Sequence, residues 1–355
     1  METAADLIFE KRSKVCEIVV VLFEYCNFSC TFCPQNHNSK LGMSYEEIMS
    51  KADPIIKYIN NNKFATGFVV RFFGGEPFAD EVIAQPQILQ AYKDVTAKIR
   101  SNVNIGERDL HFVWITNFSM KESRNKVLEF IQDQQEDTRF IVSFDFEGRF
   151  NKSSRHAFEE NIEIYKDYIE NISTVLTKQN IEAAMAGDEY FEYLYANFEY
   201  SWDKYVNGNS ISDHLTPTES LLLEFYKFLV DKYSKDDVVR DHLIMPFIYR
   251  RNNPASCSRG NGYAIDADNS IISEGCVGTH YLKRNKIYNL ETTGETKIFL
   301  NNTIENFLEK YNCHACEYYR QCPMTCFVSL KTESVKQDMD TCINKLLFKY
   351  LDSKK

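Results

Sequence analysis

Three cysteines lie within one short stretch near the start of the chain, Cys26-Asn27-Phe28-Ser29-Cys30-Thr31-Phe32-Cys33. Thiolates are soft ligands that suit iron–sulfur clusters and zinc, so three of them this close together can hold one metal centre. If that centre is a [4Fe-4S] cluster, three cysteines leave one iron without a protein ligand, and a small molecule can bind there. A structural zinc knuckle is the alternative for this spacing taken alone.

A second group of seven cysteines lies between residues 257 and 342. Its members are Cys257, Cys276, Cys313, Cys316, Cys322, Cys326 and Cys342, of which four have the spacing CxxCx5CxxxC. In a reducing compartment, this many cysteines are better explained by metal ligation than by disulfides. A zinc ribbon is the structural alternative. Only Cys16 stands apart, in an apolar run, and we expect it in the core.

Composition excludes several classes of protein. The chain has 355 residues, 44% of them hydrophobic, which is enough for one large barrel and a smaller domain. A net charge of -10 without a basic patch argues against a nucleic-acid partner. Residues 1–14 lack the apolar core of a signal peptide, and no apolar run is long enough to span a membrane. We therefore expect a cytoplasmic protein.

The elements that must position the cysteines alternate between strand and helix. The predicted strands are 16–23, 67–73, 110–116, 139–145, 172–177 and 193–200, and the predicted helices are 44–61, 81–100, 121–135, 155–170 and 181–191. Strand followed by helix, repeated, implies a parallel sheet with right-handed crossovers. The predicted fold class is therefore α/β, with a partial (β/α)6 TIM-type barrel followed by a small cysteine-rich domain.

Polar and glycine-rich motifs follow five consecutive predicted strands. They are the cysteine loop, Gly74-Gly75-Glu76-Pro77, Thr116-Asn117, Ser143-Phe144-Asp145 and Thr177-Lys178-Gln179-Asn180. In a barrel of this type the chemistry lies at the carboxyl ends of the strands. The motifs are therefore predicted to meet at one rim.

The cysteine loop, with Phe32 before its last cysteine, resembles the cluster loop of the radical S-adenosyl-L-methionine (SAM) enzymes. The resemblance implies that SAM chelates the open iron. The sequence Gly74-Gly75-Glu76-Pro77 is similar to the family motif that holds the methionine amino group. Its glycines would let the backbone approach a ligand closely and adopt positive φ. Glu76 and nearby carbonyls would accept hydrogen bonds from the ligand ammonium.

Other rim residues are candidates for the same SAM pocket. Ser143 and Asp145 alternate along a strand, so both can point toward a ribose or carboxylate, as a Ser-x-Asp does in the family. Arg155 is a candidate partner for the SAM carboxylate, and Arg149 is its competitor, which the sequence does not separate. Thr116 and Asn117 are further candidates to line the pocket.

The seven C-terminal cysteines resemble the SPASM domain, an auxiliary-cluster extension of radical SAM enzymes that modify peptides and proteins. The resemblance assigns Cys313, Cys316, Cys322 and Cys342 to an outer cluster and Cys257, Cys276 and Cys326 to an inner one. With the SAM cluster, this makes three [4Fe-4S] clusters. Since seven cysteines do not fill eight sites, the resemblance implies an inner cluster with either an open iron or a non-cysteine ligand such as His280.

The motifs divide the chain into parts. We predict an N-terminal segment at 1–15, the barrel at 16–205, a helical connection at 206–256, the SPASM-like domain at 257–345 and a tail at 346–355. The SPASM-like domain should begin with a hairpin at 263–272 that turns at Asp268-Asn269.

The resemblance implies an oxidoreductase or maturase. A reduced cluster would cleave SAM to a 5'-deoxyadenosyl radical, which abstracts a substrate hydrogen. The expected outcome is an oxidative modification of a peptide or protein, as a C-S or C-C crosslink or a side-chain oxidation. A small-molecule dehydrogenase or rearrangement enzyme is the alternative, and a structural zinc-binding protein is the remote one.

The resemblance also bears on partners and on the reaction. A flavodoxin- or ferredoxin-type protein would supply electrons. Because the first strand begins near residue 16, a separate protein would bind any leader peptide. Val277 stands where sulfatase-maturing relatives have an aspartate base, which weakens a formylglycine-forming assignment.

Overall fold

The computed structural model describes residues 15–30, 32–33, 35, 39–134, 137–146, 149–203, 215–233, 247, 262–275, 293–322 and 342–354. Its strands form one sheet in the order β6-β5-β4-β3-β2-β1-β7-β8. They are β1 Val15–Val21, β2 Gly67–Phe73, β3 Asp109–Thr116, β4 Thr138–Ser143, β5 Ile169–Val175, β6 Tyr200–Asp203, β7 Gly262–Ile265 and β8 Ile271–Gly275. The first seven are parallel, and β8 is antiparallel to β7.

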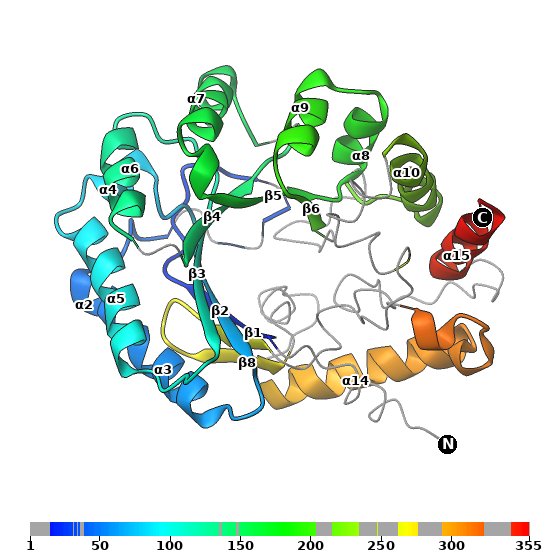
Figure 1. Ribbon diagram of the computed structural model, residues 1–355, viewed down its shortest axis with the longest axis horizontal. Helices are drawn as coiled ribbons and strands as arrows, with labels where there is room; N and C mark the ends of the chain where they lie inside the picture. Colours follow the sequence, from blue (N-terminus) through cyan, green and yellow to red (C-terminus); the bar gives the residue numbers. More distant parts are fainter. Residues whose placement is uncertain are drawn as a thin grey trace.

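The sheet curls into a half-barrel, with helices α2 to α9 along its outer side (Figure 1). These are α2 Tyr45–Ser50, α3 Ala52–Asn61, α4 Asp80–Ile83, α5 Ile88–Asn102, α6 Arg124–Gln132, α7 Lys152–Ile164, η1 Lys166–Tyr168, α8 Lys178–Met185 and α9 Glu189–Asn197. Further along the chain come α10 Glu219–Lys232, α14 Thr293–Lys310, η3 Cys313–Ala315, η4 Tyr319–Gln321 and α15 Ile343–Ser353. The predicted partial TIM-type barrel is confirmed.

Alternation of side chains along each strand separates two apolar clusters. On β1, Ile18 and Val20 belong to the large core between the sheet and its helices. Val19 and Val21 face the other way and pack with Ala264 of β7 on the inner side. Because successive strand residues point to opposite faces, each strand exposes a second set of side chains to the concave side.

The sixth predicted strand is wrong in position. Residues 193–197 belong to α9, and the strand is Tyr200–Asp203. The side chain of Asp188 caps α9 by accepting a hydrogen bond from the Phe191 amide, and the helix buries Phe191, Leu194 and Tyr195. These apolar residues recur at helical spacing, so their aromatic composition, which favours strands, was misleading.

The predicted hairpin is β7–β8, and its turn is fixed to the barrel by a buried lysine. Lys51 Nζ donates to the carbonyl oxygens of Asp266 and Ala267, at 2.7 and 2.6 Å. Tyr58 of α3 stacks on Tyr263 of β7 with ring centroids 4.2 Å apart. Burial lowers the pKa of Lys51 to about 8, although the nearby Asp266 acts in the opposite direction.

Among the helices that the structure describes, none combines the length and the apolar composition needed to cross a membrane.

Candidate active site

The cysteine loop and the Gly74–Pro77 turn form one backbone unit. Past the ends of the two strands, Gly75 N donates to Phe23 O at 2.7 Å, and Glu76 N donates to Tyr25 O at 2.8 Å. The parallel pairing of β1 with β2 thus extends to the residue before Cys26. Two motifs far apart in the sequence are therefore held together by main-chain hydrogen bonds at the carboxyl rim.

The two glycines are required by this contact. A Cβ on Gly75 would lie 1.4 Å from the Tyr25 carbonyl oxygen, and one on Gly74 would lie 2.3 Å from the Phe23 carbonyl oxygen. Neither glycine has a positive φ, so that expectation is wrong. The backbone that approaches them closely in this structure is the cysteine loop.

The three loop thiols lie on this rim without disulfides. Cys30 is buried, and Cys26 and Cys33 are half-buried. Burial raises the pKa of Cys26 to about 12, and the charge of Glu76 acts in the same direction. No three His, Cys, Asp or Glu side chains within the described ranges are arranged to hold a single metal ion. Three thiols on one loop are the donor type that iron–sulfur clusters take, so the chemistry of this donor set fits a cluster.

Glu76 joins the end of β2 to the end of β3. Its carboxylate is 2% exposed and accepts hydrogen bonds from Thr116 Oγ1 at 2.6 Å, from the Asn117 amide at 2.6 Å and from the Phe78 amide at 3.0 Å. Burial raises the pKa of Glu76 to about 7, although these donors act against the rise. The predicted SAM-pocket residues Glu76 and Thr116 therefore bind each other.

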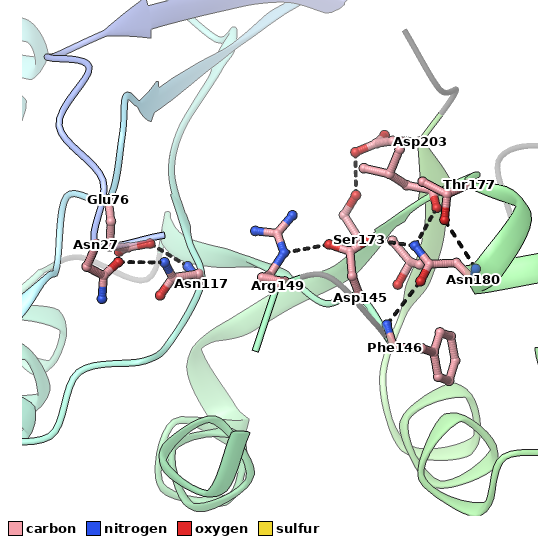
Figure 2. Close-up of polar contacts among 12 residues, drawn as sticks. Asn27, Glu76, Asn117, Asp145, Phe146, Arg149, Ser173, Thr177, Asn180 and Asp203 are labelled. Atoms are coloured by element: carbon pink, nitrogen blue, oxygen red, sulfur yellow. Dashed lines mark hydrogen bonds and ion pairs between the residues drawn. The ribbon is translucent and has the colours of Figure 1, made fainter. Parts of the chain in front are cut away.

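Asn117 is bonded to the cysteine loop. Its Nδ2 donates to Asn27 Oδ1 at 3.0 Å (Figure 2). Its Oδ1 accepts from the Ser119 hydroxyl at 2.6 Å. Asn27 Nδ2 in turn donates to Ser119 Oγ at 2.8 Å. Asn27 and Ser119 were not predicted as site residues, because Asn27 is not one of the cysteines of its loop and Ser119 lies beyond the Thr116-Asn117 motif.

A buried ion pair lies at the ends of β4 and β5. Asp145 is fully buried and accepts from Arg149 Nε at 2.5 Å and from Asn180 Nδ2 at 2.6 Å (Figure 2). Arg149 also lies over the Phe32 ring, 5.4 Å from its centroid. The guanidinium therefore lies beside the cysteine loop. Burial raises the pKa of Cys30, and the positive charge of Arg149 acts in the opposite direction.

Arg155 has different neighbours. Its Nε donates to Glu159 Oε1 at 2.7 Å. Its guanidinium carbon lies 4.7 Å from the Phe144 ring centroid and 4.3 Å from that of Tyr190. Of the two arginines that the sequence left open, Arg149 is the one beside the cysteine loop.

Two serines face each other across β4 and β5. Ser143 is in register with Ser173, and Ser173 donates a hydrogen bond to Asp203 of β6 (Figure 2). Ser143 is half-buried, and its hydroxyl makes no hydrogen bond with any residue that the structure describes. Its hydroxyl can therefore receive a ligand on the rim.

Four C-terminal thiols line one cavity of about 160 Å³, at Cys313, Cys316, Cys322 and Cys342. Burial raises the pKa of Cys313 to about 12, and the other three thiols act in the same direction. Asn344 Nδ2 donates to Cys322 Sγ at 3.4 Å, and Cys342 is the N-cap of α15. This donor set fits a cluster. Cys257, Cys276, Cys326 and His280 lie outside the described residues.

No protein-family model and no curated protein matches the sequence. Several solved structures are similar to the structure of this chain. Native anSMEcpe with bound AdoMet is 14% identical, with a TM-score of 0.63 over 96% of this chain and 97% of that chain. Native anSMEcpe with bound AdoMet and Cp18Cys peptide is 15% identical, with a TM-score of 0.61 over the same shares.

Streptococcus suis SuiB bound to precursor peptide SuiA is 14% identical, with a TM-score of 0.56 over 93% of this chain and 75% of that chain. At these identities the likeness concerns the fold. This chain therefore has the fold of these AdoMet-binding and peptide-binding proteins, and the half-barrel that the sequence predicted is part of it.

Proposed function

We propose that this chain is a radical SAM enzyme that cleaves SAM reductively and oxidatively modifies a peptide or protein. The cysteine loop, the Gly74–Pro77 turn and Arg149 meet at the carboxyl rim of the half-barrel, which supports this function. The neighbours in fold, which bind AdoMet and peptides, support it.

The rim residues divide the task of holding the cofactors. Cys26, Cys30 and Cys33 would bind the SAM cluster. Because the Glu76 carboxylate is occupied by protein donors, the main-chain carbonyls of the Gly74–Pro77 turn would accept hydrogen bonds from the SAM ammonium. When bound, the clusters and SAM supply hydrogen-atom abstraction from an unreactive carbon and an acceptor for the remaining electron.

Arg149 would bind the SAM carboxylate. Asp145 occupies its Nε, and no residue that the structure describes occupies its two Nη groups. Although burial acts against the charge, Asp145 raises the pKa of Arg149, so the guanidinium stays protonated. A fixed guanidinium with two free donor groups suits a carboxylate, to which it can make two parallel hydrogen bonds. The Ser143 hydroxyl would contact the ribose.

The C-terminal thiols would hold the auxiliary clusters. Cys313, Cys316, Cys322 and Cys342 share one cavity and would bind the outer cluster. Cys257, Cys276 and Cys326 would bind the inner one. A flavodoxin- or ferredoxin-type donor and, for a substrate with a leader, a separate leader-binding protein would complete the system.

Iron content and SAM cleavage test the proposal. After anaerobic reconstitution, we expect about twelve iron atoms per wild-type chain and about eight in a variant with Cys26, Cys30 and Cys33 changed to alanine. With dithionite and SAM, only the wild-type chain should release 5'-deoxyadenosine. Zinc in place of iron, or SAM cleavage by the triple variant, would overturn the proposal.

The substrate class has its own test. Short peptides encoded beside the gene are incubated with reconstituted enzyme, SAM and dithionite, and their masses are measured. A mass decrease of two hydrogens that requires Cys26 supports oxidative peptide modification. SAM cleavage without any change in these peptides would favour the small-molecule alternative.

A further inference from the structure

The turn that follows β3 holds a strained residue. Phe118 is fully buried and has a φ of 51°, in the left-handed region that aromatic residues rarely adopt. Asn161 of α7 donates from Nδ2 to the Phe118 and Met120 carbonyl oxygens, each at 2.8 Å. The Phe118 amide donates to Thr116 Oγ1 at 3.1 Å. Contacts at both ends of the turn therefore maintain a conformation that costs free energy.

This conformation brings the flanking side chains together. Asn117 Oδ1 accepts from both the amide and the hydroxyl of Ser119, at 3.0 and 2.6 Å. Asn117 and Ser119 are buried, and both also bond to the exposed Asn27. The three side chains form a closed ring of hydrogen bonds, which we call the Asn27 clamp.

The clamp leaves Asn117 little capacity for a ligand. Its Oδ1 accepts two hydrogen bonds, and its Nδ2 donates to Asn27. Its main-chain amide donates to Glu76 Oε2. An asparagine side chain has two donors and two acceptor lone pairs, so three of these four are used within the protein.

The clamp acts on the residue next to Cys26. Before Cys26, the amides of Gly75 and Glu76 hold the loop backbone at Phe23 and Tyr25. After Cys26, the clamp holds Asn27, whose Oδ1 lies 3.9 Å from Cys26 Sγ. The first cysteine of the loop is thus fixed on both sides, by main-chain bonds on one and by side-chain bonds on the other.

We propose that the Asn27 clamp sets the position of Cys26 and thereby the SAM cluster, and that Asn117 is a positioning residue that acts through Asn27. The inference rests on the proposed function for the identity of the group that Cys26 binds. The strained turn at Phe118 has a role in this arrangement, because it places Asn117 and Ser119 where both reach Asn27.

The first test measures cluster retention in the holoenzyme. Wild type, Asn27→Ala, Asn117→Ala and the double variant are reconstituted, and iron release to a chelator is followed with the EPR spectrum of the reduced cluster, before and after SAM is added. Each single variant should lose roughly four irons per chain about tenfold faster, with an altered EPR response to SAM. The double variant should release iron no faster than either single variant. Each single substitution already breaks the ring of hydrogen bonds, so the second has nothing further to break.

Asn62→Ala is the matched control. Asn62 also makes three side-chain hydrogen bonds, to Cys16 Sγ and to the amides of Phe64 and Ala65, but it precedes β2 at the opposite end of the barrel. Its iron release and EPR response should equal those of wild type. Unchanged release in the Asn27 and Asn117 variants, additive effects in the double variant, or an equal effect of Asn62→Ala would overturn the proposal.

A second measurement separates the clamp from the proposed function. In the metal-free chain, alkylation of Cys26 and Cys30 by iodoacetamide is followed by peptide mass spectrometry. Release of the clamp should speed alkylation of both several-fold, whereas Cys313 should react as in wild type. If wild type bound no iron, the proposed function would fail, and this measurement would still decide whether the clamp holds the loop. If Cys26 and Cys30 were alkylated at the same rate in wild type and in the Asn27 and Asn117 variants, the proposed role of the clamp would be wrong.

Discussion

Gly75 and Tyr25 are in such close contact that a Cβ on residue 75 would lie 1.4 Å from the Tyr25 carbonyl oxygen. The amide of Glu76 donates to that same oxygen at 2.8 Å. The turn after β2 and the cysteine loop after β1 are therefore in direct backbone contact, with no room between them for a side chain on residue 75.

Substitution of Gly75 by alanine should displace the cysteine loop. The obstructing atoms belong to backbone and cannot rotate away, so the loop must move and break the hydrogen bonds to Phe23 and Tyr25. We expect the reconstituted Gly75→Ala chain to lose the SAM cluster, about four iron atoms, and to keep the auxiliary clusters. Iron analysis and EPR measure both.

Gly67→Ala is the control on the same strand. A Cβ there would have ordinary contacts of 3.5 Å or more, so the variant should bind iron as wild type does. Retention of the SAM cluster by Gly75→Ala would contradict the steric argument.

Removal of Arg149 should weaken SAM binding, and removal of Arg155 should not. Because Asp145 would be left as an unpaired buried charge, the variant is Asp145→Asn/Arg149→Met, in which residue 145 can still accept from Asn180. Loss of charge-assisted hydrogen bonds predicts SAM binding weaker by about 10- to 100-fold. Equilibrium dialysis of SAM with the reconstituted protein measures it.

Arg155→Met tests the competing assignment. It removes the contacts with Phe144 and Tyr190, at a cost of about 1 kcal/mol in the free energy of unfolding. SAM affinity should stay within about twofold. Normal affinity in the double variant together with lost affinity in Arg155→Met would reverse the assignment.

Asn344 should influence the reduction potential of the outer cluster. Its Nδ2 donates to Cys322 Sγ, and hydrogen bonds to cluster sulfurs raise the potential. If the bond contributes about 1 kcal/mol, Asn344→Leu should lower the potential by roughly 40 mV. An EPR-monitored redox titration measures the shift. Lys349→Ala, on the exposed side of the same helix, should leave the potential unchanged, and an equal shift in both variants would contradict a role for the hydrogen bond.

Lys51 should give the chain a pH-dependent stability. Its pKa is about 8 in the folded state and 10.5 as the ordinary value, so between these values only the unfolded state binds the proton. The contribution of Lys51 to the free energy of unfolding is therefore smallest below pH 8. Between pH 8 and 10.5 it rises by about 1.4 kcal/mol per pH unit.

Lys51→Met removes this dependence. Urea unfolding at pH 7.5, 8.5 and 9.5 should show the wild-type chain gaining stability relative to the variant as the pH rises, by about 2 kcal/mol over this range. The comparison between the two chains isolates Lys51, because their other titrating groups are the same. If the free energy of unfolding changed with pH in the same way in both chains, Lys51 would stay charged in the folded state, contrary to this prediction.

The strand pattern and the cysteine motifs were readable from the sequence because both are local. β2 spans the predicted residues 67–73, and the predicted hairpin is β7–β8. Period-two alternation and ligand spacing reflect neighbours along the chain. The sixth strand failed because aromatic residues favour strands in general, whereas here they pack one side of α9.

The half-barrel and the place of the cysteine loop at its rim could be predicted from the sequence and are confirmed, whereas the metal centre that these thiols would hold stays a prediction. The tertiary structure alone decided that Arg149 lies beside the loop, that the glycines make room for Tyr25, and that Asn117 reaches Asn27. These contacts join segments distant in the sequence, and no local spacing encodes which distant atoms will meet. The division into parts and the inner-cluster ligands Cys257, Cys276 and Cys326 stay predictions of the sequence.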